Sequence, residues 1–235
     1  MYNLLWIHVN FVCNSSEILI FFFNRHNRAE VAFAALKQQI YSREPCILTV
    51  LHPALLSFLP IIDKKPDQPS TAQETSQADI LLSLLITNAA TENTIVLRRL
   101  YSKFVTEYVQ MLGLNSVSHL SHLISLVSQY LEVFDGPEEE SRLNAVTLLQ
   151  AVIQNTWPRI QGHSDTIVKT LLKLIQDVVN EKSNVSQNVK DKLKTEAVQC
   201  LELVIEVCPE TKESLSMISQ SPHLKGIAKE LEGLF

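Results

Sequence analysis

From residue 26 onward, apolar residues recur at spacings of three and four, which is the period of an amphipathic α-helix. The clearest example is the segment 94–112, which carries one apolar face and is followed by Gly113, a residue type favoured just after a helix. The same pattern predicts helices over 28–42, 46–60, 77–90, 94–112, 116–134, 137–156, 165–181, 187–208 and 210–220, and a short one after Pro222. The chain is therefore predicted to be all-α.

The predicted helices return at a regular interval. If they pair in order along the chain, the first helices begin near 93, 138 and 187 and the second near 116, 164 and 210, at intervals of 45, 49, 48 and 46 residues. HEAT and armadillo units repeat every 40 to 47 residues or so. The short connection after 94–112 predicts an antiparallel pair with 116–134. Stacked pairs that cover one another's apolar faces predict a HEAT/armadillo-like α-solenoid.

A polar segment with several prolines, DKKPDQPSTAQETSQ, interrupts this pattern at 63–77. It predicts a linker between a helical pair at 26–62 and a helical-repeat region at 78–235. Within the pair, Pro53 is expected to interrupt the second helix, which is expected to end near Pro60. Ser76 is expected to cap the helix that follows the linker.

Residues 1–24 form an apolar segment of a different kind. The run 4–23 has the length of a membrane helix, yet polar residues, including Glu17, lie inside it, and no Lys or Arg precedes it. Three interpretations stay open: a membrane anchor, a buried packing helix, or a non-native start. The abrupt change to polar sequence at Asn24 favours the last.

Composition narrows the classes of function. The chain of 235 residues has only five glycines, and no two of them form G-x-G, which disfavours phosphate-binding loops and nucleotide-dependent catalysis. The net charge of −5, with no basic stripe, disfavours nucleic acid and favours a protein partner. The four cysteines, Cys13, Cys46, Cys200 and Cys208, form no C-x-x-C pair, which favours a reducing compartment.

Three clusters carry residue types used in catalysis or metal binding. His119 and His122 share a helix face, but no further ligand completes a metal site. Glu138–Glu140 suits the electropositive first turn of a helix. In the tetrapeptide 162–165, GHSD, helix capping accounts for Ser164 and Asp165 better than a catalytic triad does. We therefore expect no catalytic residue, no cofactor and no metal, and we expect the chain not to be an enzyme.

The most distinctive local motif is Trp157-Pro158-Arg159. Because proline disfavours helical backbone at the preceding residue, Trp157 is expected at a turn between two helices. Tryptophan and arginine are enriched among the anchors of protein interfaces. The alternative is a tryptophan packed between adjacent repeats. These three residues are the candidate protein-interface residues.

The run RLNAVTLLQAVIQNTWPRIQGHSDTIVKTLLKLI, residues 142–175, resembles the Tti family of telomere-length-regulator-interacting proteins, which includes the second interacting subunit of the Triple T complex. W-P-R-I is its most specific part, and the likeness extends from about residue 26 to the C-terminus. Residues 1–24 depart from the family pattern, and we expect family members to carry further N-terminal sequence.

The resemblance implies a non-catalytic scaffold subunit that binds the first interacting subunit and the telomere-length regulator. It also implies action with Hsp90 and an adaptor complex in the maturation and stability of phosphatidylinositol 3-kinase-related kinases, in the cytoplasm and the nucleus. The alternative is a transport-type or membrane-tethered solenoid adaptor, motivated by the apolar run 4–23.

Overall fold

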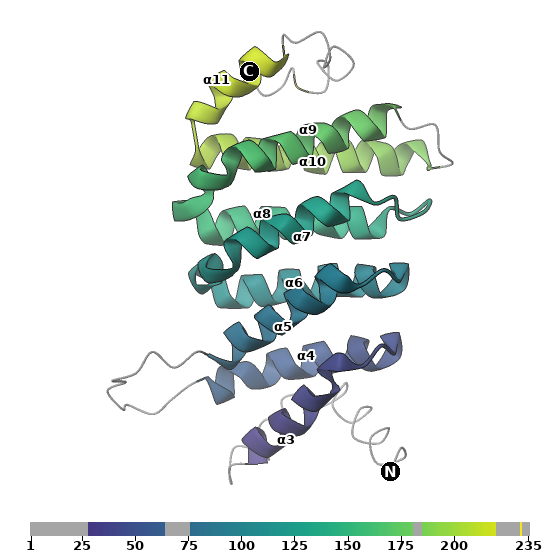
Figure 1. Ribbon diagram of the computed structural model, residues 1–235, viewed down its shortest axis with the longest axis vertical. Coiled ribbons are helices and arrows are strands. Elements are labelled where there is room, and N and C mark those ends of the chain that lie inside the picture. Colours follow the sequence, from purple (N-terminus) through teal and green to yellow (C-terminus); the bar gives the residue numbers. More distant parts are fainter. Residues whose placement is uncertain (1–27, 64–75, 181–184, 220–230, 232–235) are drawn as a thin grey trace. The chain divides into compact units, whose positions relative to one another are not determined.

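Helices make up the described part of this computed structural model, which comprises residues 28–63, 76–180, 185–219 and Leu231 (Figure 1). No strand occurs among these residues, and the predicted all-α class is confirmed. The chain divides into two compact units, residues 1–88 and 89–235. The N-terminal segment 1–24 and nearly all of the helix expected after Pro222 lie outside the described residues.

The first unit contains α3 (Arg28–Lys37), the 3-10 helix η1 (Gln38–Tyr41) and α4 (Pro45–Ile62), followed by the larger part of α5 (Gln77–Thr91). The prediction that Pro53 interrupts α4 was wrong, because α4 continues through Pro53 and ends at Ile62, close to the end expected near Pro60. A proline removes one backbone hydrogen bond, but helices in proteins owe most of their stability to packing. α4 packs against α3 and η1 and buries a continuous set of side chains: Leu48, Leu51, Ala54, Leu55, Phe58 and Leu59.

α4 is also the one described helix that is long and apolar enough to cross a membrane. Its mean hydropathy is 1.9, and 39% of its 18 residues are buried. A core helix of a globular unit meets the same criteria of length and composition. The buried part of α4 packs against α3 and η1.

The start of α5 is capped from two directions. The hydroxyl of Ser76 accepts a hydrogen bond from the Asp79 amide at 3.1 Å, so the predicted cap is confirmed. The carboxylate of Asp63, the residue after α4, accepts from the amides of Gln77 at 2.8 Å and Ala78 at 3.2 Å. These bonds join the end of α4 to the start of α5 across the sequence of the predicted linker.

The second unit is a stack of helices in two layers (Figure 1). Its elements are α6 (Ile95–Leu112), η2 (Gly113–His119), α7 (Leu120–Glu132), α8 (Glu140–Ile160), η3 (Gln161–His163), α9 (Ser164–Asn180), α10 (Gln187–Val207) and α11 (Glu210–Ser219). α6, α8 and α10 lie side by side in one layer, and α7 and α9 lie side by side in the other.

The interval along the stack is regular. α6, α8 and α10 begin at residues 95, 140 and 187, which gives intervals of 45 and 47 residues. α7, α9 and α11 begin at 120, 164 and 210, which gives intervals of 44 and 46. The predicted helical solenoid is confirmed, whereas its assignment to the HEAT or armadillo class stays a prediction.

The predicted pairing of helices was wrong by one element. α7 packs along α8 and α9 along α10, whereas the prediction paired 94–112 with 116–134. The cause is η2, which occupies the expected short connection. Seven residues at the 2.0 Å rise of a 3-10 helix span about 14 Å, more than the 8–10 Å between packed helices. The chain therefore passes through η2 from α6 to α7, which belongs to the next pair and packs along α8. Gly113, with φ of 55°, makes the predicted stop of α6.

Candidate protein-interaction surfaces

The clusters weighed for catalysis or metal binding are held by ordinary helix contacts. His119 ends η2, and His122 is exposed on the first turn of α7. Among the described residues no group of three or more His, Cys, Asp or Glu is placed to hold a metal ion. The capping role expected for Ser164 was wrong, since its hydroxyl donates to the Gln161 carbonyl at 3.0 Å instead of accepting from an amide.

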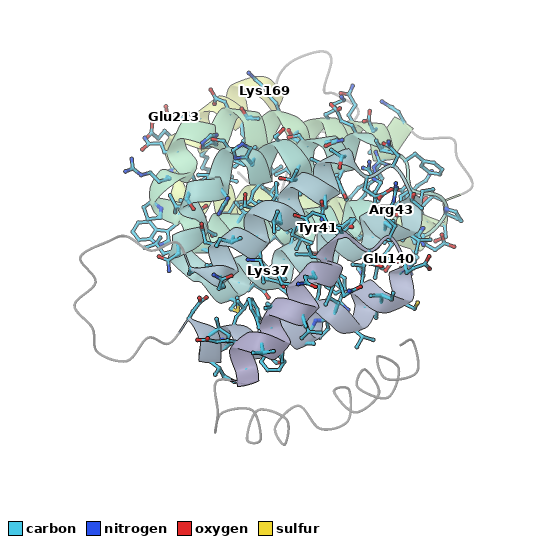
Figure 2. All side chains as sticks on the ribbon, turned by 60° about the horizontal axis from the view of Figure 1, so that its bottom comes forward. Lys37, Tyr41, Arg43, Glu140, Lys169 and Glu213 are labelled. Atoms are coloured by element: carbon cyan, nitrogen blue, oxygen red, sulfur yellow. The ribbon has the colours of Figure 1, made fainter. Side chains whose placement is uncertain are left out.

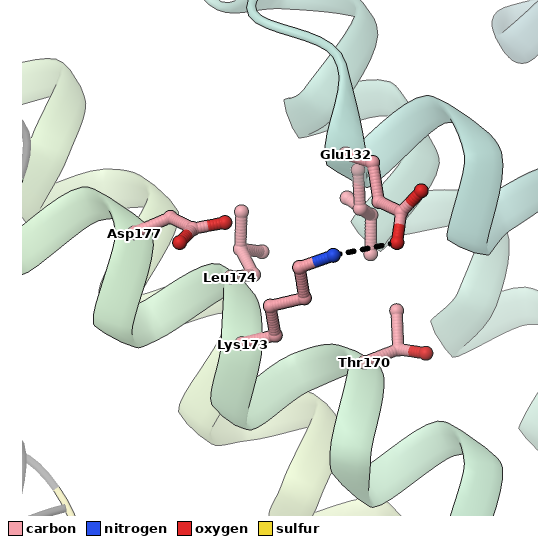
Figure 3. Close-up of a pocket in the computed structure, with 6 residues that line it drawn as sticks. Glu132, Thr170, Lys173, Leu174 and Asp177 are labelled. Carbon is pink, nitrogen blue, oxygen red and sulfur yellow. Dashed lines mark hydrogen bonds and ion pairs between the residues drawn. The ribbon is translucent and has the colours of Figure 1, made fainter. Parts of the chain in front are cut away.

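A small hollow lies between α7 and α9 (Figure 3). Its volume is about 20 Å³, enough for a single water molecule. At its mouth Lys173 Nζ lies 2.7 Å from Glu132 Oε1, and this hydrogen bond raises the pKa of Lys173. The hollow is too small for a substrate or cofactor.

The C-terminal end of α8 presents the Trp157 turn, which we define as Trp157, Pro158 and Arg159. All three side chains are exposed, and 60% of Trp157 is accessible to solvent. The interpretation of Trp157 as a residue packed between repeats is therefore wrong. Its role in an interface stays a prediction. Two further exposed apolar side chains, Met111 and Leu114, lie at the end of α6 and in η2.

The backbone of α8 explains why Trp157 is exposed. The helix is kinked at Thr156, whose φ and ψ are −119° and 19°, one residue before the position expected from Pro158. Two side chains donate hydrogen bonds to backbone carbonyls near the kink. Asn155 Nδ2 donates to Ala151 O at 2.8 Å, and Thr156 Oγ1 donates to Val152 O at 2.7 Å. The kink buries Thr156 and leaves the next three residues exposed.

The N-terminal end of α8 is built from charged side chains. The guanidinium of Arg99, on α6, lies 3.1 Å from Asp135 Oδ2 and donates to the Asp135 carbonyl at 2.9 Å. It also contacts Glu138 at 3.2 Å and Glu140 at 3.4 Å. Asp135 Oδ2 in turn accepts from the Ser141 amide at 2.6 Å. One arginine therefore ties α6 to the connection between α7 and α8.

A second arginine lies inside this connection. Arg142 is buried on α8, donates to the Leu131 carbonyl at 2.9 Å, and lies 3.3 Å from the carboxylate of the buried Glu139. Glu139 has a left-handed backbone, with φ of 51°. The prediction that Glu138–Glu140 share the first turn of a helix was right for Glu140 only, because this turn of the backbone delays α8 to Glu140.

The arrangement at this end of α8 was not predicted from the sequence. The predicted helix 116–134 includes Phe134, but α7 ends at Glu132 and Phe134 is exposed. The Asp-Gly-Pro break at 135–137 was the available signal that a helix stops before it. No sequence pattern linked Arg99 to residues 36 to 41 positions away.

Comparison with known proteins gives close relatives. The chain is 34% identical over 200 residues to TELO2-interacting protein 2 of Homo sapiens, which covers 84% of this chain and 39% of that protein. It is 34% identical over 181 residues to TELO2-interacting protein 2 of Mus musculus, covering 77% of this chain and 35% of that protein. The chain thus spans less than half of these relatives. No family model matches it, and no solved structure matches it.

The relatives bear out the resemblance first suggested by residues 142–175, and their names describe interacting proteins rather than enzymes. The described helices form the solenoid that this resemblance implies. The chain belongs to the Tti family, the family of TELO2-interacting protein 2.

Proposed function

We propose that this chain is a non-catalytic scaffold subunit of the Triple T cochaperone complex, in which it binds TELO2, the telomere-length regulator, and the first interacting subunit. The similarity to TELO2-interacting protein 2 over 200 residues carries the proposal, because those relatives are named for an interaction with TELO2. The helical stack supports it, since solenoids of this kind present extended surfaces to other proteins.

The wider role in kinase maturation is part of the same proposal and rests on membership of the Tti family. The complex acts with Hsp90 in the maturation and stability of phosphatidylinositol 3-kinase-related kinases, and this chain works there in the cytoplasm and the nucleus. The phosphoryl-transfer reaction belongs to the client kinase. The scaffold contributes binding surfaces. The hollow between α7 and α9 has room for one water molecule.

Within this role the Trp157 turn is a contact with a partner subunit. Trp157 and Arg159 are both exposed in this turn, and both residue types are frequent among residues that dominate binding energy. The kink at Thr156 and the hydrogen bonds of Asn155 and Thr156 hold the turn in place, so that little conformational freedom is lost on binding.

The test is affinity purification of the full chain from cells, followed by mass spectrometry. Recovery of TELO2 and the first interacting subunit is expected under mild conditions. Trp157→Ala should reduce their recovery several-fold, and Tyr41→Ala is the matched control, because Tyr41 is an aromatic side chain with 65% exposure at the end of η1 (Figure 2). Absence of both subunits from the wild-type sample contradicts the proposed function.

The alternative is a solenoid adaptor tethered to a membrane, for which the apolar run 4–23 is the motivating observation. A carbonate wash of isolated membranes separates the two. A membrane-anchored chain stays in the pellet, whereas a chain without an integral anchor is released into the supernatant.

A further inference from the structure

Four large apolar side chains are exposed at the N-terminal end of α8. Ile95 and Val96, on the first turn of α6, are 45% and 52% exposed, and Val133 and Phe134, after α7, are 43% and 46% exposed. Clustered apolar side chains in contact with water mark binding surfaces more often than scattered ones do.

The Arg99 contacts hold together the two segments that carry these four side chains. Ile95 and Val96 precede Arg99 by four and three residues, so they lie on the same side of α6 as Arg99. Val133 and Phe134 immediately precede Asp135, which receives two hydrogen bonds from Arg99. Both apolar pairs therefore flank one ion pair.

The residues that support this surface are largely buried and hydrogen-bonded. Asp135 is held by Arg99 and by the Ser141 amide, and Arg142 fixes the end of α7 through the Leu131 carbonyl. A binding surface that is already ordered loses less conformational entropy when its partner arrives. Phe134 is suited to act as the anchor, since aromatic side chains are enriched among dominant interface residues.

The charge of the surface selects the partner. The single guanidinium of Arg99 meets three carboxylates, those of Asp135, Glu138 and Glu140, which leaves an excess of two negative charges. Glu138 and Glu140 are both exposed, and Figure 2 marks Glu140 at the start of α8. Lysine or arginine is the complement of such a surface, whereas nucleic acid and acidic segments are repelled.

We propose that the Arg99 surface, defined as Ile95, Val96, Arg99, Val133, Phe134, Glu138 and Glu140, binds a segment of another Triple T subunit that carries apolar side chains next to lysine or arginine. This inference rests on the proposed function and locates one of its contacts. The apolar side chains supply affinity, and the glutamates orient the basic residues of the partner.

The test uses the full chain in a quantitative binding assay with purified complexes of TELO2 and the first interacting subunit. The double variant Val96→Ala with Phe134→Ala should lower affinity at least about tenfold. Its matched control is Val31→Ala with Tyr41→Ala, a valine and an aromatic residue that are 72% and 65% exposed on α3 and η1, which should bind like wild type. Thermal unfolding of each variant checks the fold.

A second variant tests the contribution of the negative charge to binding. It also tests the Arg99 surface if the first variant unfolds. Glu138→Gln with Glu140→Gln keeps oxygen acceptors for Arg99 but removes two negative charges. It should lower affinity about threefold at low salt, and the difference should vanish at high salt because exposed charges are screened.

The outcomes separate the two proposals. Wild-type binding that neither double variant alters overturns the Arg99 surface and leaves the proposed function standing. Failure of the wild-type chain to bind any Triple T subunit overturns both. A wild-type dimer in sedimentation that Val96→Ala with Phe134→Ala dissociates also overturns the inference, because the surface then binds a second copy of this chain.

Discussion

The two ends of α8 fix their surroundings by different means. At the N-terminal end, charged side chains that are largely removed from water hold the connection to α7: Arg99 with Asp135, and Arg142 with Glu139. At the C-terminal end, short-range hydrogen bonds from Asn155 and Thr156 support a kink, and the side chains beyond it are exposed.

The two ends differ in whether water can replace an interaction that is lost. A buried charge that loses its partner is left uncompensated, so the connection around Glu139 and Arg142 has one favourable arrangement. An exposed side chain such as Arg159 can replace a lost contact with water, so losing that contact changes the free energy of unfolding little. We infer that the buried pairs beneath the Arg99 surface contribute most to stability, whereas the exposed side chains of the Trp157 turn contribute little.

Removing Arg142 is expected to give the largest effect. Arg142→Ala leaves the buried carboxylate of Glu139 without this cation and should lower the free energy of unfolding by about 3–5 kcal/mol. Urea unfolding of the full chain measures the loss. Arg159→Ala, the matched control at the other end of α8, should stay within about 0.5 kcal/mol of wild type.

A second substitution sharpens this comparison. In the Arg142→Ala background, Glu139→Gly removes the carboxylate, and glycine readily adopts the φ of 51° found at this position. Part of the lost stability should therefore return. Equal losses for Arg142→Ala and Arg159→Ala would contradict the contrast between the two ends.

A smaller effect is expected at the kink. Thr156→Val preserves the shape of a fully buried side chain but removes its hydrogen bond to the Val152 carbonyl, and should cost about 1 kcal/mol. Thr147 makes the same type of bond, to Leu143 O at 3.1 Å, on the exposed side of α8. Thr147→Val should cost less, because water replaces the lost hydroxyl. Urea unfolding compares them, and similar costs would show that burial of the bond is unimportant.

Local features of this fold followed from the sequence. Helical periodicity located α6, α9 and α10 to within one residue at each end, because these helices have distinct apolar faces and clear stop signals. Gly113 and Ser76 act as expected, since a positive φ and a side-chain cap depend on neighbouring residues alone.

Features that depend on distant contacts did not follow from the sequence. The helix-pairing prediction failed because η2 is locally compatible with an α-helical pattern. The helix α4 continues past Pro53 because its packing outweighs a lost hydrogen bond. Among the candidate interface residues, the sequence placed Trp157 near a turn but left its exposure open. The Arg99 contacts join residues 36 to 41 positions apart, and no local rule pairs them.

The smallest change in stability is expected at Trp157. Because 60% of its side chain is exposed, Trp157→Ala removes few packing contacts and should change the free energy of unfolding by no more than about 0.5 kcal/mol, measured by urea unfolding. Tyr41→Ala, with its similar exposure, is the control. A loss of about 3 kcal/mol at Trp157, the range of a buried aromatic residue, would contradict the exposed position of this side chain. Unchanged stability combined with reduced recovery of Triple T subunits would place the energetic role of Trp157 in binding, the converse of Arg142.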